Sequence, residues 1–110
     1  MPQFMYQFAY TPESWAAQLK NPQNRIETVG KQVCEAAGGR LVGAWLCFGE
    51  YDAVLIIDVP DSESMAAIAL AVGAGGALKT GKTTALMSAS QGVNALKKAD
   101  AVAKVYRPAR

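Results

Sequence analysis

The chain has 110 residues, of which 51% are apolar, and its 11 basic and 9 acidic side chains give a net charge of +2. This composition predicts one folded domain and excludes both a disordered chain and a uniformly basic nucleic-acid-binding chain. The sequence contains no histidine, which excludes the histidine-based sites for zinc, haem and non-haem iron and the commonest general base near neutral pH. We therefore expect no metal and no cofactor.

Cysteine content and hydropathy indicate a location inside the cell. The two cysteines, Cys34 and Cys47, are predicted to be reduced and buried, because no secretory signal precedes them. The longest weakly polar run, residues 65–78, is shorter than the ~18 residues of a membrane helix and contains three glycines. We expect a cytoplasmic protein without membrane contact.

The first predicted strand covers residues 3–10, where aromatic side chains alternate with other residues and so share one face. These aromatic residues are Phe4, Tyr6, Phe8 and Tyr10. Thr11 and Pro12 then predict the start of a helix, because threonine can cap a helix and proline suits its first turn. Asn21 and Pro22 interrupt this helix.

The helical pattern resumes after this break. Apolar residues follow at spacings of three and four from Ile26 to Ala37, which predicts a longer helix. Gly38 and Gly39 come directly after it, and glycine tolerates the positive φ of a helix C-cap. We therefore expect a short helix, a break and a longer helix.

Two apolar runs, residues 40–48 and 53–59, are rich in β-branched and aromatic residues and are predicted to form a hairpin. The second strand has no polar alternation between Val54 and Ile57. A strand of this kind is buried on both sides. We therefore expect both faces of the second strand to be covered.

A further helix and strand follow the hairpin. Residues 60–63 are predicted to stop the strand and cap a helix whose apolar stripe ends at Val72. A fourth strand is expected over residues 78–87, and Ser90 is predicted to cap a final helix. The apolar residues near one face of that helix are Val93, Leu96, Ala103 and Tyr106.

This order, β-α-β-β-α-β followed by a C-terminal helix, is the ferredoxin-like arrangement, an α+β fold in which a four-stranded antiparallel sheet carries its main helices on one face. We assign residues 1–89 to this domain and residues 90–110 to a helical extension. The other face of the sheet must be covered by the C-terminal helix or by a second copy, because the strand at 53–59 is apolar throughout. We expect a homo-oligomer, in its simplest form a dimer with the two sheets packed face to face.

Three segments resemble the GYD family of small bacterial and archaeal proteins: Gly49-Glu50-Tyr51-Asp52, Pro60-Asp61 and the glycine-rich turn at residues 73–76. The resemblance covers residues 3–88 and places the Gly-x-Tyr-Asp motif in the predicted hairpin. It implies a ferredoxin-like fold of the dimeric α+β barrel type. It implies no particular reaction, because the family is largely uncharacterised.

Residues 76–83, with the sequence GALKTGKT, fit the phosphate-binding pattern G-x-x-x-x-G-K-[ST]. A phosphate-binding loop leaves a strand and opens a helix, so that the amides at the helix start meet the phosphate. Here a helix is predicted before the segment and a strand after it. We interpret the match as accidental.

The motif Gly49-Glu50-Tyr51-Asp52 has a structural and a catalytic interpretation. In the first, which we favour, Gly49 takes an unusual backbone angle, Asp52 accepts hydrogen bonds from backbone amides, and Tyr51 packs against its neighbours. In the second, Tyr51 and Asp52 supply a proton donor and a base at the mouth of a barrel, and Lys82 is a further candidate for proton transfer.

A second candidate site consists of Tyr6, Trp45, Lys82 and Thr84, which would line a cavity between sheet and helices or between two copies and bind a ligand there. In the alternative, which we favour, Tyr6 and Trp45 are aromatic residues of the core or of an interface. Cys47 has no histidine to activate it and is predicted to be inert.

Basic residues collect in the C-terminal extension, where residues 90–110 carry a net charge of +4. The charged residues are Lys97, Lys98, Lys104, Arg107 and Arg110, opposed by Asp100. We interpret the basic residues as the solvated face of the final helix and expect no contact with nucleic acid. The apolar side of this helix is expected to dock on its own subunit or on a neighbour.

Taken with the resemblance, these patterns predict a homo-oligomer that holds a small, partly apolar molecule in a cleft beside its sheet. One alternative is a cofactor-independent enzyme, similar to a monooxygenase or an isomerase, that uses Tyr51, Asp52 or Lys82 for proton transfer. Another is a structural module that acts through its oligomer. An enclosed cavity with convergent polar groups favours binding or catalysis, and a filled barrel favours the structural module.

Overall fold

The computed structural model describes residues 1–109, which contain four strands and four helices. The strands are β1 (Gln3–Tyr10), β2 (Arg40–Leu46), β3 (Ala53–Asp58) and β4 (Leu78–Leu86). The helices are α1 (Pro12–Lys20), α2 (Arg25–Ala36), α3 (Ser62–Ala74) and α4 (Ala89–Ala103). The predicted elements are present in the predicted order, and β2, β3 and β4 end slightly earlier than expected.

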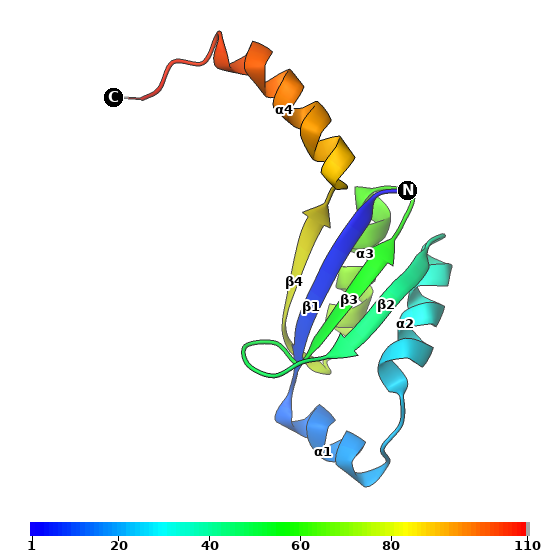
Figure 1. Ribbon diagram of the computed structural model, residues 1–110. Helices are drawn as coiled ribbons and strands as arrows, with labels where there is room; N and C mark the ends of the chain where they lie inside the picture. The colour runs from blue at the N-terminus through cyan, green and yellow to red at the C-terminus, as the bar shows by residue number, and fades with distance from the viewer. Residues whose placement is uncertain (110) are drawn as a thin grey trace.

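The four strands form one antiparallel sheet in the order β2-β3-β1-β4 (Figure 1). β1 and β3 lie in the centre, with Tyr6 opposite Leu55, and β2 and β4 form the edges. α2 and α3 cover one face of the sheet, and within residues 1–109 no helix lies over the other, which we call the open face (Figure 1). This arrangement confirms the predicted ferredoxin-like α+β fold.

The core lies between the sheet and the helices α2 and α3. The aromatic face of β1 is buried there, as the alternation along this strand predicted. β3 adds Ala53, Leu55 and Ile57, and α3 adds Met65 and Ile68. Because side chains alternate along a strand, the residues between these on β1 and β3 point to the open face.

Side-chain caps fix where the helices begin. Thr11 caps α1 as predicted, its hydroxyl accepting a hydrogen bond from the Ser14 amide at 3.1 Å. α4 begins earlier than predicted, because Ser88 rather than Ser90 is its cap. The Ser88 hydroxyl accepts from the Gln91 amide, and the Gln91 side chain accepts from the Ser88 amide. This reciprocal pair satisfies two backbone donors, whereas Ser90 already lies within the first turn.

Gly38 and Gly39 end α2 as predicted. Gly38 has a φ of 81°, and the amides of Gly38 and Gly39 donate to the carbonyls of Glu35 and Cys34, each at 2.9 Å. These two bonds form the common glycine-based C-cap of helices. A Cβ on Gly39 would overlap the carbonyl oxygen of Asp58, so Gly39 also sets how closely the end of α2 approaches β3.

α4 leaves the end of β4 and extends away from the rest of the molecule (Figure 1). Only Met87 and Ser88 connect β4 to α4, and the extended backbone of Ser88, with φ −66° and ψ 162°, carries the chain onward. Of the two expected docking partners of this helix, its own subunit is therefore not used within residues 1–109, and α4 does not cover the open face of its own sheet. Docking on a neighbour stays a prediction. Tyr106 lies beyond the end of α4 and does not extend its apolar face.

Candidate functional site

The loop between β2 and β3 holds the Gly-x-Tyr-Asp motif. Gly49 has a φ of 119°, which glycine adopts readily and other residues rarely. The Asp52 carboxylate accepts a hydrogen bond from the Tyr10 amide at 2.9 Å, and the Asp52 amide donates to the Phe8 carbonyl at 2.8 Å. Asp52 therefore ties the loop to the end of β1, where the pairing register with β4 shifts.

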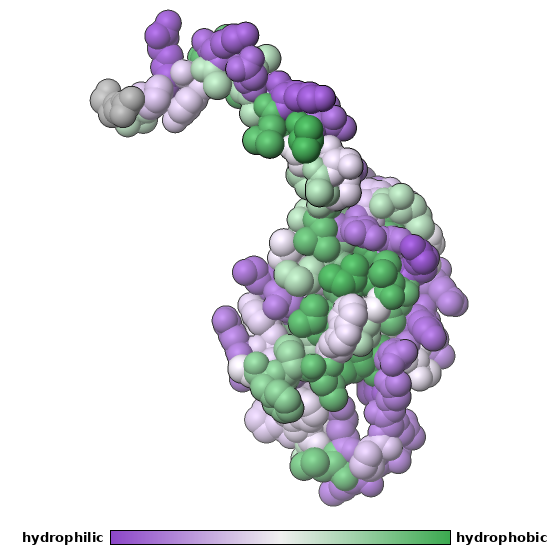
Figure 2. Space-filling model, viewed as in Figure 1, coloured by the Kyte–Doolittle hydropathy of each residue, from purple (hydrophilic) through white to green (hydrophobic). Residues whose placement is uncertain are grey.

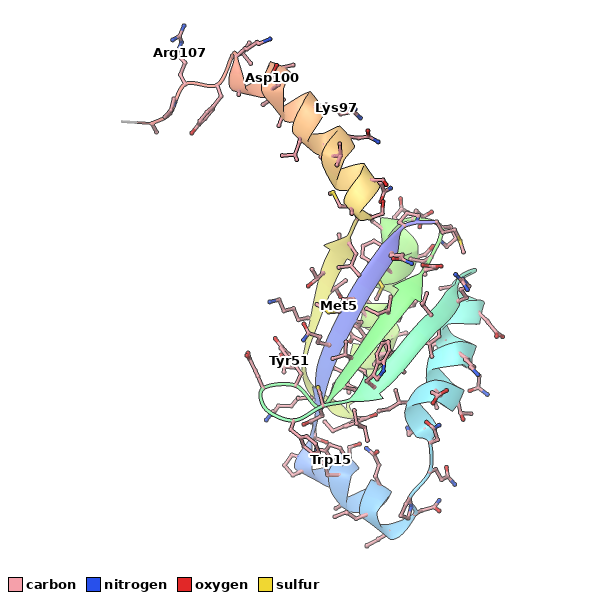
Figure 3. The ribbon with its side chains drawn as sticks, viewed as in Figure 1. Met5, Trp15, Tyr51, Lys97, Asp100 and Arg107 are labelled. Carbon is pink, nitrogen blue, oxygen red and sulfur yellow. The ribbon has the colours of Figure 1, made fainter. Side chains whose placement is uncertain are left out.

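Tyr51 is half-buried in the same loop, which lies at one end of the sheet (Figure 3). Its carbonyl oxygen accepts a hydrogen bond from the Cys47 thiol at 3.1 Å. Tyr51 and Asp52 are neighbours in this loop, but neither residue lines the cleft described below.

Two rows of paired residues cross the open face from β2 to β4. One row is Trp45, Val54, Gln7 and Lys82, and the next is Gly43, Ile56, Met5 and Thr84. Apolar residues gather in the middle of this face (Figure 2), where Figure 3 labels Met5. The Trp45 side chain is 57% exposed and lies over Gly43, since a Cβ on Gly43 would come within 2.6 Å of the indole ring. Trp45, Lys82 and Thr84 thus share the open face.

Tyr6 lies on the opposite, helix-covered face. It is 4% exposed, and its side chain points to the same face as those of Phe4 and Phe8. Lys82 and Thr84 pair with Gln7 and Met5, whose side chains point to the open face. The Tyr6 hydroxyl lies against β4, where a Cβ on Gly81 would be 3.0 Å away. Tyr6, Trp45, Lys82 and Thr84 therefore do not line one cavity.

A cleft of about 320 Å³ opens between α2 and α3 over the helix-covered face. The central strands form its floor, with Tyr6, Phe8, Tyr10, Leu55 and Ile57. Val29 and Val33 of α2 line one wall, and Ile68 and Val72 of α3 line the other. The cleft is therefore mainly apolar, and its volume is at the lower end of the ~300–1,000 Å³ range of small-molecule sites.

The residues with polar side chains that border this cleft are Tyr6, Tyr10, Cys34 and the exposed Arg25. Burial raises the pKa of Tyr6, of Tyr10 and of Cys34, and Arg25 opposes the shift at Tyr10. At neutral pH the hydroxyls and the thiol are therefore protonated. The cleft offers hydrogen-bond donors and one cation, a set that suits a ligand with an apolar body and an anionic end.

Sequence reasoning missed Arg25 and Tyr10 as site residues. Arg25 is the first residue of α2, directly after the cap Asn24. A cation at this end of a helix is opposed by the helix dipole, and this unfavourable placement is the signal that could have indicated a role for Arg25. The cleft itself depends on the separation of α2 and α3, which no local pattern of residues encodes.

Residues 76–83 do not form a phosphate-binding loop. Gly76 has a φ of 79° after the end of α3, and the chain is the extended strand β4 from Leu78 onward. Within residues 1–109, no group of three or more His, Cys, Asp or Glu side chains could hold a metal ion. Over the same residues, no helix combines the length and apolar character needed to cross a membrane.

A family model described as the GYD domain matches residues 4–96. The match therefore continues past β4 into α4, beyond the segment in which the resemblance was noted from the sequence. A search of curated proteins found no match.

Three solved structures share the fold at low sequence identity. MtbAldR is 14% identical with a TM-score of 0.61, over 79% of this chain and 52% of that one, so this chain spans about half of its length. FFRP-DM1 is 10% identical with a TM-score of 0.53, over 79% of this chain and 100% of that one. An uncharacterised NIPSNAP domain protein from Burkholderia xenovorans is 19% identical with a TM-score of 0.50, over 81% of this chain and 95% of that one. These similarities show a shared fold.

Proposed function

This chain belongs to the GYD domain family. Because membership of this family implies no particular reaction, we propose a function from the geometry of the chain itself. The protein binds a small, partly apolar molecule with an anionic end in the cleft between α2 and α3. The observation that carries the proposal is an apolar lining combined with the Arg25 guanidinium and the protonated Tyr10 hydroxyl. The apolar body of the ligand would be buried between Val29 and Val72, and its anionic end would meet Arg25.

Calorimetric titration with phenylacetate, octanoate and the corresponding uncharged amides tests this ligand class. We expect the acids to bind more tightly than the amides, because only the acids gain a charged partner in Arg25. Arg25→Gln should remove this difference. Lys31→Gln changes an exposed cation of α2 that does not line the cleft, so it should preserve the difference. Equal affinities of acid and amide for the wild-type protein would contradict the proposal.

We also propose that a second copy covers the open face in solution. Val54 and Ile56 are only half-buried on this face, and Trp45 is 57% exposed beside them. A contiguous apolar patch of this kind is a frequent mark of an interaction surface. A second sheet packed against it would remove Trp45 and its apolar neighbours from water.

Sedimentation equilibrium tests whether a second copy covers the open face. We expect the wild-type protein to be a dimer at micromolar concentration and Ile56→Lys to be a monomer, because the substitution puts a charge in the middle of the apolar patch. Leu70→Lys serves as the matched control, because Leu70 is 73% exposed on α3, on the other side of the sheet. A monomeric wild-type protein would refute this part of the proposal.

The two alternatives have weaker support. A proton-transferring enzyme would use Asp52 as its base, but the Asp52 carboxylate already accepts a hydrogen bond from the Tyr10 amide. Lys82 lies on the open face, and Tyr51 does not reach the cleft. A purely structural module would have no use for an unfilled cleft.

The two free cysteines support a reducing, cytoplasmic location.

A further inference from the structure

The helix α4 and the residues after it form a C-terminal arm, residues 89–109, that stands apart from the domain (Figure 1). The radius of gyration is 17.4 Å, whereas a compact chain of this length would have about 13 Å. The molecule extends over 59 Å along its longest axis and 34 Å along the next. No residue of α4 is buried, so the arm lacks a packing partner within residues 1–109.

A helix of this length needs a packing partner. α4 has 15 residues, and isolated helices shorter than about 12–15 residues are marginally stable in water even with good helix formers. Gly92, Val93 and Asn94 are poor helix formers in the second turn. The capping box at Ser88 stabilises only the start of the helix. Contact with another molecule would supply the stability that the sequence of α4 does not.

The contact surface of α4 is an apolar stripe along one side. It consists of Ala89, Val93, Leu96, Ala99 and Ala103, which recur at the spacing of three and four that places residues on one helix face. Asp100, four residues after Leu96, lies on the same side of the helix, where its carboxylate is ion-paired with Lys104 at 3.3 Å. Figure 2 shows apolar residues on one side of α4 and hydrophilic residues on the other. Val93 is 50% exposed and Leu96 is 72% exposed, so the stripe meets water in the single chain.

Charge indicates which molecule covers this stripe. Residues 1–88 carry six basic and eight acidic side chains, a net charge of −2, whereas the arm carries four basic and one acidic, a net charge of +3, to which Arg110 adds one more in the sequence. Two arms laid side by side would repel each other, whereas an arm and a domain attract. Figure 3 shows Lys97 and Arg107 projecting outward from the arm.

We propose that the C-terminal arm of one copy packs, through its apolar stripe, against the domain of a second copy. The partner therefore supplies the packing that α4 lacks, and the opposite charges of arm and domain set the pairing. This inference rests on the proposed homo-oligomer and adds to it a contact that the open face does not contain.

A matched pair of alanine substitutions tests the proposal. Ala99→Glu places a charge in the apolar stripe, and Ala101→Glu places the same charge on the opposite side of the same helix. Both alanines are exposed in the single chain, so neither change disturbs the domain. Sedimentation equilibrium should show Ala99→Glu weakening dimerisation by about tenfold or more, and Ala101→Glu by less than about twofold. The helical circular dichroism of the wild-type protein should rise as dimers form.

The remaining outcomes each decide against the arm contact. Equal dimerisation of Ala99→Glu and Ala101→Glu would overturn the arm contact alone and would leave the open face to be judged from Ile56→Lys, so the failure of one contact can be told from the failure of the other. A helical signal that rises with phosphatidylglycerol vesicles but not with protein concentration would overturn it in favour of a membrane surface as the partner.

Discussion

Gly39 and Gly73 respond in opposite ways to an added methyl group. A Cβ on Gly39 would overlap the Asp58 carbonyl oxygen and lie 2.8 Å from a Val59 methyl carbon, whereas a Cβ on Gly73, inside α3, would meet open space. We predict that Gly39→Ala destabilises the fold by about 2–3 kcal/mol and that Gly73→Ala stabilises it by up to about 1 kcal/mol. Urea unfolding measures both, and a Gly39→Ala protein as stable as wild type would show that α2 can move away from β3.

Tyr6, Tyr10 and Cys34 link folding to alkaline pH. Burial raises the pKa of each above its ordinary value, which is 10.0 for tyrosine and 9.0 for cysteine. The folded state therefore holds these protons more tightly than the unfolded state. The contribution of these three groups to the free energy of unfolding is fully present below about pH 9. It is lost as the pH rises through the pKa values that the groups have in the folded state.

We predict from this sign that the urea midpoint falls between pH 8 and about pH 11. Tyr6→Phe removes one of the three titrating groups, so its urea midpoint should fall less than that of the wild-type protein over the same pH interval. Tyr51→Phe is a suitable control, because it removes a hydroxyl from the loop between β2 and β3 rather than from a residue that lines the cleft. An identical decline for wild type and Tyr6→Phe would show that Tyr6 does not contribute.

At the scale of residues, the face of a side chain was predictable within one strand but not between strands. The alternation along β1 identified Tyr6 as part of an aromatic core face, which the structure confirms. The sequence does not state how β4 is aligned against β1, because that register depends on the loops and helices between them. Lys82 and Thr84 were therefore grouped with Tyr6, although they lie on the other side of the sheet.

At the scale of elements, the start of α4 depends on Ser88. We predict that Ser88→Ala speeds hydrogen exchange of the first-turn amides of α4, because an N-cap contributes about 1 kcal/mol. Ser90→Ala should leave exchange at these amides nearly unchanged, because the Ser90 side chain has no role in the capping box. Mass spectrometry of exchanged peptides measures both variants, and equal exchange would contradict the assignment of the cap.

The signal for this cap was present in the sequence. Ser88 and Gln91 are three residues apart, which is the spacing of a capping box, whereas Ser90 has no such partner. Elements with strong periodicity, such as β1 and α2, were predicted correctly because one local pattern determines each of them. The direction of α4 was not predictable, because it depends on the backbone at Met87 and Ser88 rather than on periodicity.

At the scale of the whole molecule, the single sheet separates two surfaces with different proposed roles. The cleft lies on the helix-covered face, and the apolar patch lies on the open face. Val72 of α3 lines the cleft, whereas Leu70 is exposed on the outside of the same helix.

We predict that Val72→Phe fills part of the cleft and weakens phenylacetate binding by about tenfold or more while leaving the dimer intact. Leu70→Phe should change neither property. Loss of the dimer in Val72→Phe would show that the two faces of the sheet are not independent.

Opposite charges at the two ends of a molecule 59 Å long make the monomer an electric dipole. A net charge of +2 therefore understates how strongly the free arm is drawn to a polyanion. On a cation-exchange resin, a single chain would bind with its arm foremost. An assembly in which each arm lies against a neighbouring domain would hide much of that charge and elute at lower salt.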